Sequence, residues 1–142
     1  MISLAAAQAI VSSSLAHARE TGLPPMTVAV LDGRAALIAF GSEDGSSLLR
    51  EKISRGKAAG ALNMGVGSRA LAARAESHPD FFVALNAMSA GNVVPVAGGV
   101  LVRDDSGLVI AAVGVSGAVP DLDEACAMAG IAASGLIGDP GA

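Results

Sequence analysis

Residues 100–118, VLVRDDSGLVIAAVGVSGA, decide the fold. Two apolar runs rich in β-branched residues, Val100–Arg103 and Leu108–Val115, flank the polar segment Asp104–Gly107. Runs of this kind on either side of a short turn that contains glycine predict a β-hairpin. This part of the chain therefore predicts two neighbouring antiparallel strands.

A helix is expected after this hairpin. Asp121 would cap the helix, and Glu124 stands three residues later, at the capping-box position. Its packing face would consist of small residues and one methionine, namely Ala125, Met128, Ala129 and Ala132.

The N-terminal part predicts a helix and a second hairpin. Apolar residues recur at three- and four-residue spacing from Leu4 to Ala18, as on one helix face, and Ser3 is the expected N-cap. The runs Met26–Leu31 and Ala35–Phe40 then flank an Asp32-Gly33 turn. A helix followed by a hairpin thus occurs before the middle of the chain.

The middle of the chain predicts more helices. Ser46 and Ser47 are expected to cap one that runs to about Met64. Gly56 and Gly60 inside it cost about 1 kcal/mol each relative to alanine, so we expect a backbone or a ligand to approach them closely. Shorter helices are expected at 69–75 and 79–87, and an extended run at 93–96. Hairpins separated by helices indicate an antiparallel α+β layer protein.

Length and composition restrict the protein class further. A chain of 142 residues fits a single domain, residues 1–142. Hydrophobic residues make up 52% and charged residues only 15%, so a monomer would expose unusual apolar area and we expect self-association. The net charge of −4 argues against nucleic-acid binding, which needs clustered lysine and arginine.

Cellular context follows from three further absences in the sequence. The single cysteine, Cys126, cannot form an intramolecular disulfide and suits a small core residue. The apolar N-terminus has no basic segment of the signal-peptide type, and no apolar run reaches membrane-spanning length. We therefore expect a cytoplasmic protein that does not bind membranes.

Several short blocks, spaced over nearly the whole chain, are typical of one protein family. They are Val28-Ala29-Val30-Leu31-Asp32, Asp44-Gly45-Ser46, Lys57-Ala58, Gly98-Gly99 and Gly114-Val115-Ser116-Gly117-Ala118, followed by Asp123 and Ala127. The pattern resembles the GlcG/HbpS-like family, the haem-degrading domain that also forms the C-terminal domain of PduO-type adenosyltransferases. The resemblance implies a profilin-like three-layer α/β/α sandwich with a five-stranded antiparallel sheet, assembled into dimers or rings such as octamers. It also implies that some members bind haem.

Lys57 is the first candidate for chemistry, because it lies on the glycine-lined stretch of the second predicted helix. A desolvated lysine can act as a base or hold an anion, and a salt bridge with Asp32, Asp44 or Asp123 is the structural alternative. Arg50 lies seven residues earlier, about two helical turns, and could share the same face.

A second group of candidates lies around the two glycine-containing turns. Exposed N–H groups in the segment Gly114, Val115, Ser116 and Gly117 could receive an anionic or carbonyl oxygen, with Ser116 as a further donor. The family resemblance adds Gly98 and Gly99 as ligand-binding candidates. Asp123 either caps the last helix or faces the pocket.

A metal site has little support in the sequence, which contains only His17 and His78. Some haem-binding relatives are understood to use a first-helix histidine as axial ligand, which makes His17 a haem-ligand candidate by resemblance. A surface histidine is the alternative interpretation, and His78-Pro79 is expected in a loop.

Two functions remain open at this stage. The first is a binding protein that holds haem or a carboxylated metabolite at a subunit interface through Lys57, Arg50 and the Gly114–Gly117 loop. The second is a small cofactor-free enzyme, of the isomerase, lyase or dehydratase type, that moves a proton next to a carbonyl. Lys57 with Asp32 or Asp123 would then be the acid and the base.

Overall fold

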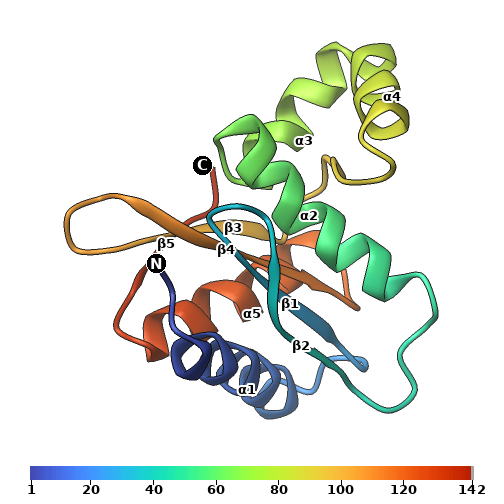
Figure 1. Ribbon diagram of the computed structural model, residues 1–142. Coiled ribbons are helices and arrows are strands. Elements are labelled where there is room, and N and C mark those ends of the chain that lie inside the picture. The colour runs from blue at the N-terminus through green and yellow to red at the C-terminus, as the bar shows by residue number, and fades with distance from the viewer. Residues whose placement is uncertain (142) are drawn as a thin grey trace.

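The computed structural model describes residues 1–141, which form five helices and five strands in an α+β arrangement (Figure 1). The helices are α1 (Leu4–Glu20), α2 (Arg50–Met64), α3 (Ser68–Ser77), α4 (Pro79–Met88) and α5 (Pro120–Ala133). The strands are β1 (Thr27–Asp32), β2 (Leu37–Ser42), β3 (Gly99–Arg103), β4 (Val109–Ser116) and β5 (Ile137–Asp139).

All five strands join one antiparallel sheet, as the family resemblance implied. The order of the strands is β2-β1-β4-β3-β5. Both expected hairpins form, and β1 and β4 pair in the centre of the sheet. The expected strand at 93–96 is wrong, because this segment is a loop. The fifth strand is β5, which pairs with β3 through register partners such as Val102 and Gly138.

The sheet lies between two helical layers. Helices α1 and α5 pack together on one face, and α2 crosses the other face over β1, β3 and β4 (Figure 1). The larger apolar core lies under α1 and α5, and a smaller one under α2 is centred on Leu31, Leu101 and Ala112. This confirms the three-layer α/β/α sandwich.

Of the three predicted helix caps, the one on α1 forms and those on α2 and α5 do not. Ser3 caps α1 as expected, since its Oγ accepts the Ala6 N–H at 3.1 Å. Ser46 and Ser47 do not cap α2, which begins after Leu49 without a side-chain cap. Asp121 and Glu124 do not form a capping box either: α5 begins after Val119, with Pro120 in its first turn.

The buried face of α5 differs from the expected one. Ala132 is exposed and Ala125, Met128 and Ala129 are half-buried, whereas the buried positions are Asp123, Cys126, Ala127, Gly130 and Ile131. The close crossing with α1 selects this face, because a Cβ on Gly130 would meet the Ser14 Oγ and, at 2.7 Å, the Ile10 oxygen. In an alanine-rich helix, hydrophobicity alone does not distinguish the two faces.

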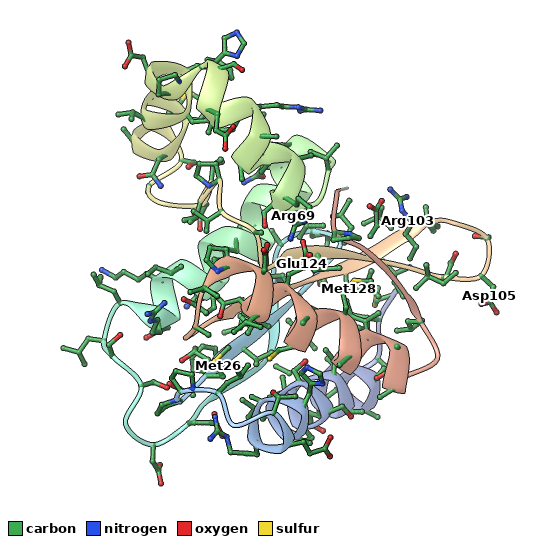
Figure 2. All side chains as sticks on the ribbon, turned by 180° about the vertical axis from the view of Figure 1, so that it is seen from behind. Met26, Arg69, Arg103, Asp105, Glu124 and Met128 are labelled. Carbon is green, nitrogen blue, oxygen red and sulfur yellow. The ribbon has the colours of Figure 1, made fainter. Side chains whose placement is uncertain are left out.

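Helices α3 and α4 form a small projection beside α2 (Figure 1). A separate cluster of Leu71, Phe82 and Val93 holds them together. Arg69, near the start of α3, connects this projection to α5: its guanidinium donates to Glu124 Oε2 at 2.9 Å and to Asp121 Oδ1 at 2.6 Å. Figure 2 shows Arg69 beside Glu124. None of the helices in residues 1–141 has the length and apolar character that crossing a membrane requires.

Candidate functional site

Lys57 lies in the middle of α2 and is 1% exposed. Its ammonium group donates to Asp123 Oδ2 at 2.9 Å and to the Val115 main-chain oxygen at 3.0 Å. The structure thus brings together Lys57 and Asp123, which are 66 residues apart in the sequence. The amino group reaches from α2, past the end of β4, to the first turn of α5.

Asp123 is the matching buried acid, and it is also 1% exposed. Its Oδ1 accepts the Ala118 N–H at 2.8 Å, so both carboxylate oxygens have a donor. Burial raises the pKa of the Asp123 carboxyl, and the Lys57 ammonium opposes this shift. Burial lowers the pKa of Lys57, and the attraction to Asp123 opposes that shift in turn.

Arg50 and Ser116 belong to the same neighbourhood. The Arg50 guanidinium donates to Ser116 Oγ at 3.0 Å, and its charge adds to the lowering of the Lys57 pKa. The expectation that Arg50 lies near Lys57 and the Gly114–Gly117 loop is therefore confirmed. Whether these residues bind a ligand stays a prediction.

The glycines of this region pack against main chain. A Cβ on Gly114 would collide with the Ser54 oxygen, and one on Gly99 with the Lys57 oxygen, so both allow α2 to lie directly on the sheet. A Cβ on Gly117 would meet the Pro25 oxygen at 2.5 Å. Gly98 has a φ of +121°, in the region that favours glycine, and its oxygen accepts the Val115 N–H at 3.0 Å.

Asp32 lies away from this cluster. In the β1–β4 register Asp32 pairs with Ala111 and Thr27 pairs with Ser116, so five residues of extended strand, about 17 Å, separate the two ends. The Asp32 carboxylate accepts the N–H groups of Arg34 at 2.8 Å and Ala36 at 3.0 Å, and these bonds lower its pKa. Asp32 therefore orders the β1–β2 turn and is not placed to exchange a proton with Lys57.

A different region of the chain forms a mainly apolar groove. Met64, Arg74, His78, Phe81 and Phe82, contributed by α2, α3, α4 and the junction between α3 and α4, line a pocket of about 400 Å³. We call it the α3–α4 groove. The two phenylalanine rings meet edge to face, with centroids 5.6 Å apart. Four further pockets in residues 1–141 have no histidine in their lining, and none of these five pockets is lined by Lys57 or Asp123.

The polar groups of the α3–α4 groove are available for a ligand. The main chain of His78 joins the two helices, since its N–H donates to the Arg74 oxygen and its oxygen accepts the Phe82 N–H. Within residues 1–141, neither the His78 imidazole nor the Arg74 guanidinium forms a hydrogen bond or ion pair. The imidazole of His78 and the guanidinium of Arg74, both exposed to solvent, thus lie beside an aromatic wall without a partner among residues 1–141.

The earlier haem-ligand candidate, His17, is half-buried in the last turn of α1 and lines none of the five pockets. Sequence reasoning assigned His78 to a loop and did not connect it with the aromatic residues. A usable signal was present: His78 lies four residues after Arg74 and just before two of the three phenylalanines in the chain.

A family model and several solved structures match this chain. The family model described as "Haem degrading protein HbpS-like" matches residues 2–132. No curated protein matches the chain in sequence.

Solved structures agree with the family match. The crystal structure of the PduOC–haem complex superposes with a TM-score of 0.83 at 21% identity, covering 93% of this chain and 94% of that one. A double mutant of HbpS from Streptomyces reticuli gives 0.79 at 27% identity, covering 92% and 85%. The protein ORFY from Klebsiella pneumoniae gives 0.84 at 23% identity, covering 94% and 90%.

Proposed function

Because the chain belongs to the HbpS-like family of haem-degrading proteins, we propose that it binds haem, and that the haem occupies the α3–α4 groove. One observation carries this proposal: an unpaired imidazole and an unpaired guanidinium lie beside an aromatic wall in a single pocket. Haem sites combine an apolar wall, an axial ligand for the iron and cations for the propionates. The five residues of the groove supply each of these.

Each residue of the groove would have its own role toward haem. His78 would ligate the iron, since imidazole is a common axial ligand of haem iron. Arg74 would pair with a propionate, for which guanidinium is a suitable partner. Phe81, Phe82 and Met64 would cover a face of the macrocycle. A pocket of about 400 Å³ is within the usual range for small-molecule sites.

Two properties of these residues support ligand binding. Phe81 is 55% exposed, so its ring is accessible to an apolar ligand. The projection is also anchored firmly enough to hold a defined shape, through Phe82, which is 4% exposed, and through the Arg69 ion pairs with α5.

The alternative function, proton transfer by Lys57 with an acid partner, has less support. Lys57 is 1% exposed, and its amino group already donates to Asp123 and to the Val115 oxygen. A substrate would have to displace one of these bonds inside the protein. Lys57 and Asp123 are better explained as a buried pair that joins α2, β4 and α5.

Titration with hemin, followed through its Soret band, tests the proposal. We expect saturable binding with one haem per chain. His78→Ala should weaken binding by at least about tenfold, which corresponds to 1.4 kcal/mol. His17→Ala is the matched control, because it removes the other imidazole of the chain. Added imidazole should restore the wild-type spectrum to His78→Gly.

Arginine variants test the propionate contact. Arg74→Gln should weaken haem binding, whereas Arg55→Gln, which removes an exposed guanidinium outside the groove, should not. Loss of binding in His17→Ala with retention in His78→Ala would move the site to α1. Absence of binding by the folded wild-type protein would overturn haem as the ligand, and saturable binding of an organic acid would then favour a carboxylated metabolite.

A further inference from the structure

We propose that a second ligand site lies beside α2, and that it takes a small carboxylate that also carries hydroxyl groups, such as a sugar acid. The site is a hollow of about 270 Å³ lined by Leu31, Ala35, Arg55, Ala59, Asn63 and Asn92. We call it the α2 hollow. It shares no residue with the α3–α4 groove, so the inference does not depend on haem binding.

Three segments of the chain meet at the α2 hollow: helix α2, the β1–β2 hairpin and the loop that follows α4. The loop lies directly on α2 at Gly56, where a Cβ would meet the Gly91 oxygen at 2.6 Å. The Val94 N–H donates to the Gly56 oxygen at 3.2 Å. In addition, Asn63 Nδ2 donates to the Asn92 main-chain oxygen at 3.3 Å. The loop that carries Asn92 is therefore held in place before any ligand binds.

The Arg55 guanidinium is the cation of the α2 hollow. Its only polar contact within residues 1–141 is with Glu51, whose Oε1 lies 3.5 Å from Nη1. Both side chains are about half exposed, and an ion pair of this length and exposure contributes little. A guanidinium presents five N–H donors in a planar fork that fits a carboxylate. Most of these donors remain available to a ligand.

The two amide side chains favour hydroxyl groups on the ligand. Asn63 and Asn92 each donate one hydrogen bond to a main-chain oxygen, that of Asn92 and that of Ser89 respectively. Within residues 1–141, neither amide oxygen accepts a hydrogen bond. An amide oxygen needs a donor, which a hydroxyl group supplies and an inorganic anion such as sulfate does not. The polar lining therefore favours a hydroxylated carboxylate over an inorganic anion.

The remaining lining of the α2 hollow is aliphatic. Leu31 and Ala59 are 3% and 4% exposed, and they offer an apolar contact to the carbon skeleton of the ligand. The lining contains no aromatic residue, so it offers no stacking surface to a large planar ring. The volume is also below the roughly 300 to 1,000 Å³ that is usual for sites of drug-sized ligands. The ligand is consequently small and mostly aliphatic.

Ala35 has a backbone conformation that folding alone does not favour. Its φ is +65°, in the left-handed region that favours glycine, and its side chain is exposed. Glycine would adopt this conformation at lower cost. Residues in strained conformations of this kind cluster at ligand sites. A contact between the Ala35 methyl group and the ligand gives the alanine a role that glycine could not fill.

Isothermal titration calorimetry with gluconate and glucuronate as probes tests this inference. We expect saturable binding of at least one of the two acids, with one molecule per chain. Hexanoate has the carboxylate without the hydroxyl groups, and sorbitol has hydroxyl groups without the carboxylate. Each should bind at least about tenfold more weakly than the acid. Protein loaded with haem should bind the acid as tightly as haem-free protein, because the two sites share no residue.

Variants of α2 assign the binding to the hollow. Arg55→Gln should weaken binding of the acid by at least about tenfold, and Asn63→Ala by about three- to tenfold. Glu51→Gln should strengthen it, because the variant removes the carboxylate that competes for Arg55. Lys52→Gln is the matched control and should leave binding unchanged, since Lys52 is an exposed cation of the same helix outside the hollow. Circular dichroism establishes that each variant is folded.

Ala35→Gly should raise the unfolding temperature and weaken binding of the acid, a combination that a purely structural role would not produce. Three results would overturn the inference. The first is that the folded wild type binds neither acid saturably, and the second is that hexanoate binds as tightly as the hydroxylated acid. The third is loss of binding in Arg50→Gln with retention in Arg55→Gln, which would place the acid near Lys57 and Ser116.

Discussion

The buried pair of Lys57 and Asp123 gives the sharpest prediction for stability. Lys57→Met keeps most of the side-chain volume but removes the donor to Asp123 Oδ2 and to the Val115 oxygen. Asp123 then keeps only the Ala118 N–H. Breaking one partner of a buried ion pair costs about 3 to 5 kcal/mol, because the other charge stays buried without compensation. We expect a loss in this range for Lys57→Met.

Asp123→Asn should cost a similar amount, because it leaves the Lys57 ammonium buried beside a neutral amide. The double variant removes both charges, so its loss should be smaller than the sum of the single losses by about 2 to 3 kcal/mol. Urea unfolding at a fixed protein concentration measures all four free energies of unfolding. A loss below about 1 kcal/mol for Lys57→Met, or additive losses, would refute the structural role of the pair.

The pH dependence of Asp123→Asn is a second test of the same pair. Burial lowers the pKa of Lys57 below its ordinary 10.5, and the variant lacks the carboxylate that opposes this shift. Between the folded pKa and 10.5 the folded state binds fewer protons than the unfolded state, so stability rises with pH in that window. The deficit of Asp123→Asn relative to wild type should therefore shrink between pH 7 and pH 10. A constant deficit would mean that Lys57 does not lose its proton.

Three further predictions concern packing, acid stability and the Arg69 contact. Gly114→Ala should destabilise the protein by about 1 to 3 kcal/mol in urea unfolding, because the new Cβ would collide with the Ser54 oxygen. Gly33→Ala is the control and should be close to neutral, because the atom nearest to its new Cβ would lie 3.8 Å away. The pKa of Asp32 is lowered in the folded state, so the ionised carboxylate stabilises the fold above the ordinary pKa of 3.8, and this stabilisation is lost as the pH falls below that value. Asp32→Asn should therefore flatten the fall in unfolding temperature between pH 5 and pH 3. Arg69→Met should increase amide hydrogen exchange in α3 and α4 with little change in global stability, since its ion pairs are partly exposed; unchanged exchange would contradict this role.

Much of the fold could be predicted from the sequence, because its elements follow local rules. Both hairpins have apolar runs around polar turns, and the Ser3 cap is a contact between neighbouring residues. β5 could not be predicted, since Ile137-Gly138-Asp139 has little strand character and forms a strand by pairing with β3. The face of α5 likewise depends on the crossing with α1 at Gly130.

The candidate site, too, could be predicted from the sequence only in part. The sequence predicted a carboxylate partner for Lys57 but left Asp32, Asp44 and Asp123 open, and the structure shows that the partner is Asp123. Ligand binding by the surrounding glycines stays a prediction, and the structure adds that Gly99 and Gly114 allow α2 to pack closely on the sheet. The α3–α4 groove was missed because it depends on how three helices meet, and only the spacing of Arg74 and His78 hinted at it.

The most direct test of the central claim is a proton–nitrogen correlation spectrum of the protein with and without ferric haem. Paramagnetic iron broadens the amide signals of nearby residues. Haem in the α3–α4 groove should broaden the signals of Arg74, His78 and Phe81 and leave those of Lys57 and Ser116 sharp. Broadening around Lys57 and Ser116, with the groove unaffected, would contradict the assignment and return the ligand to the site first suggested by the sequence.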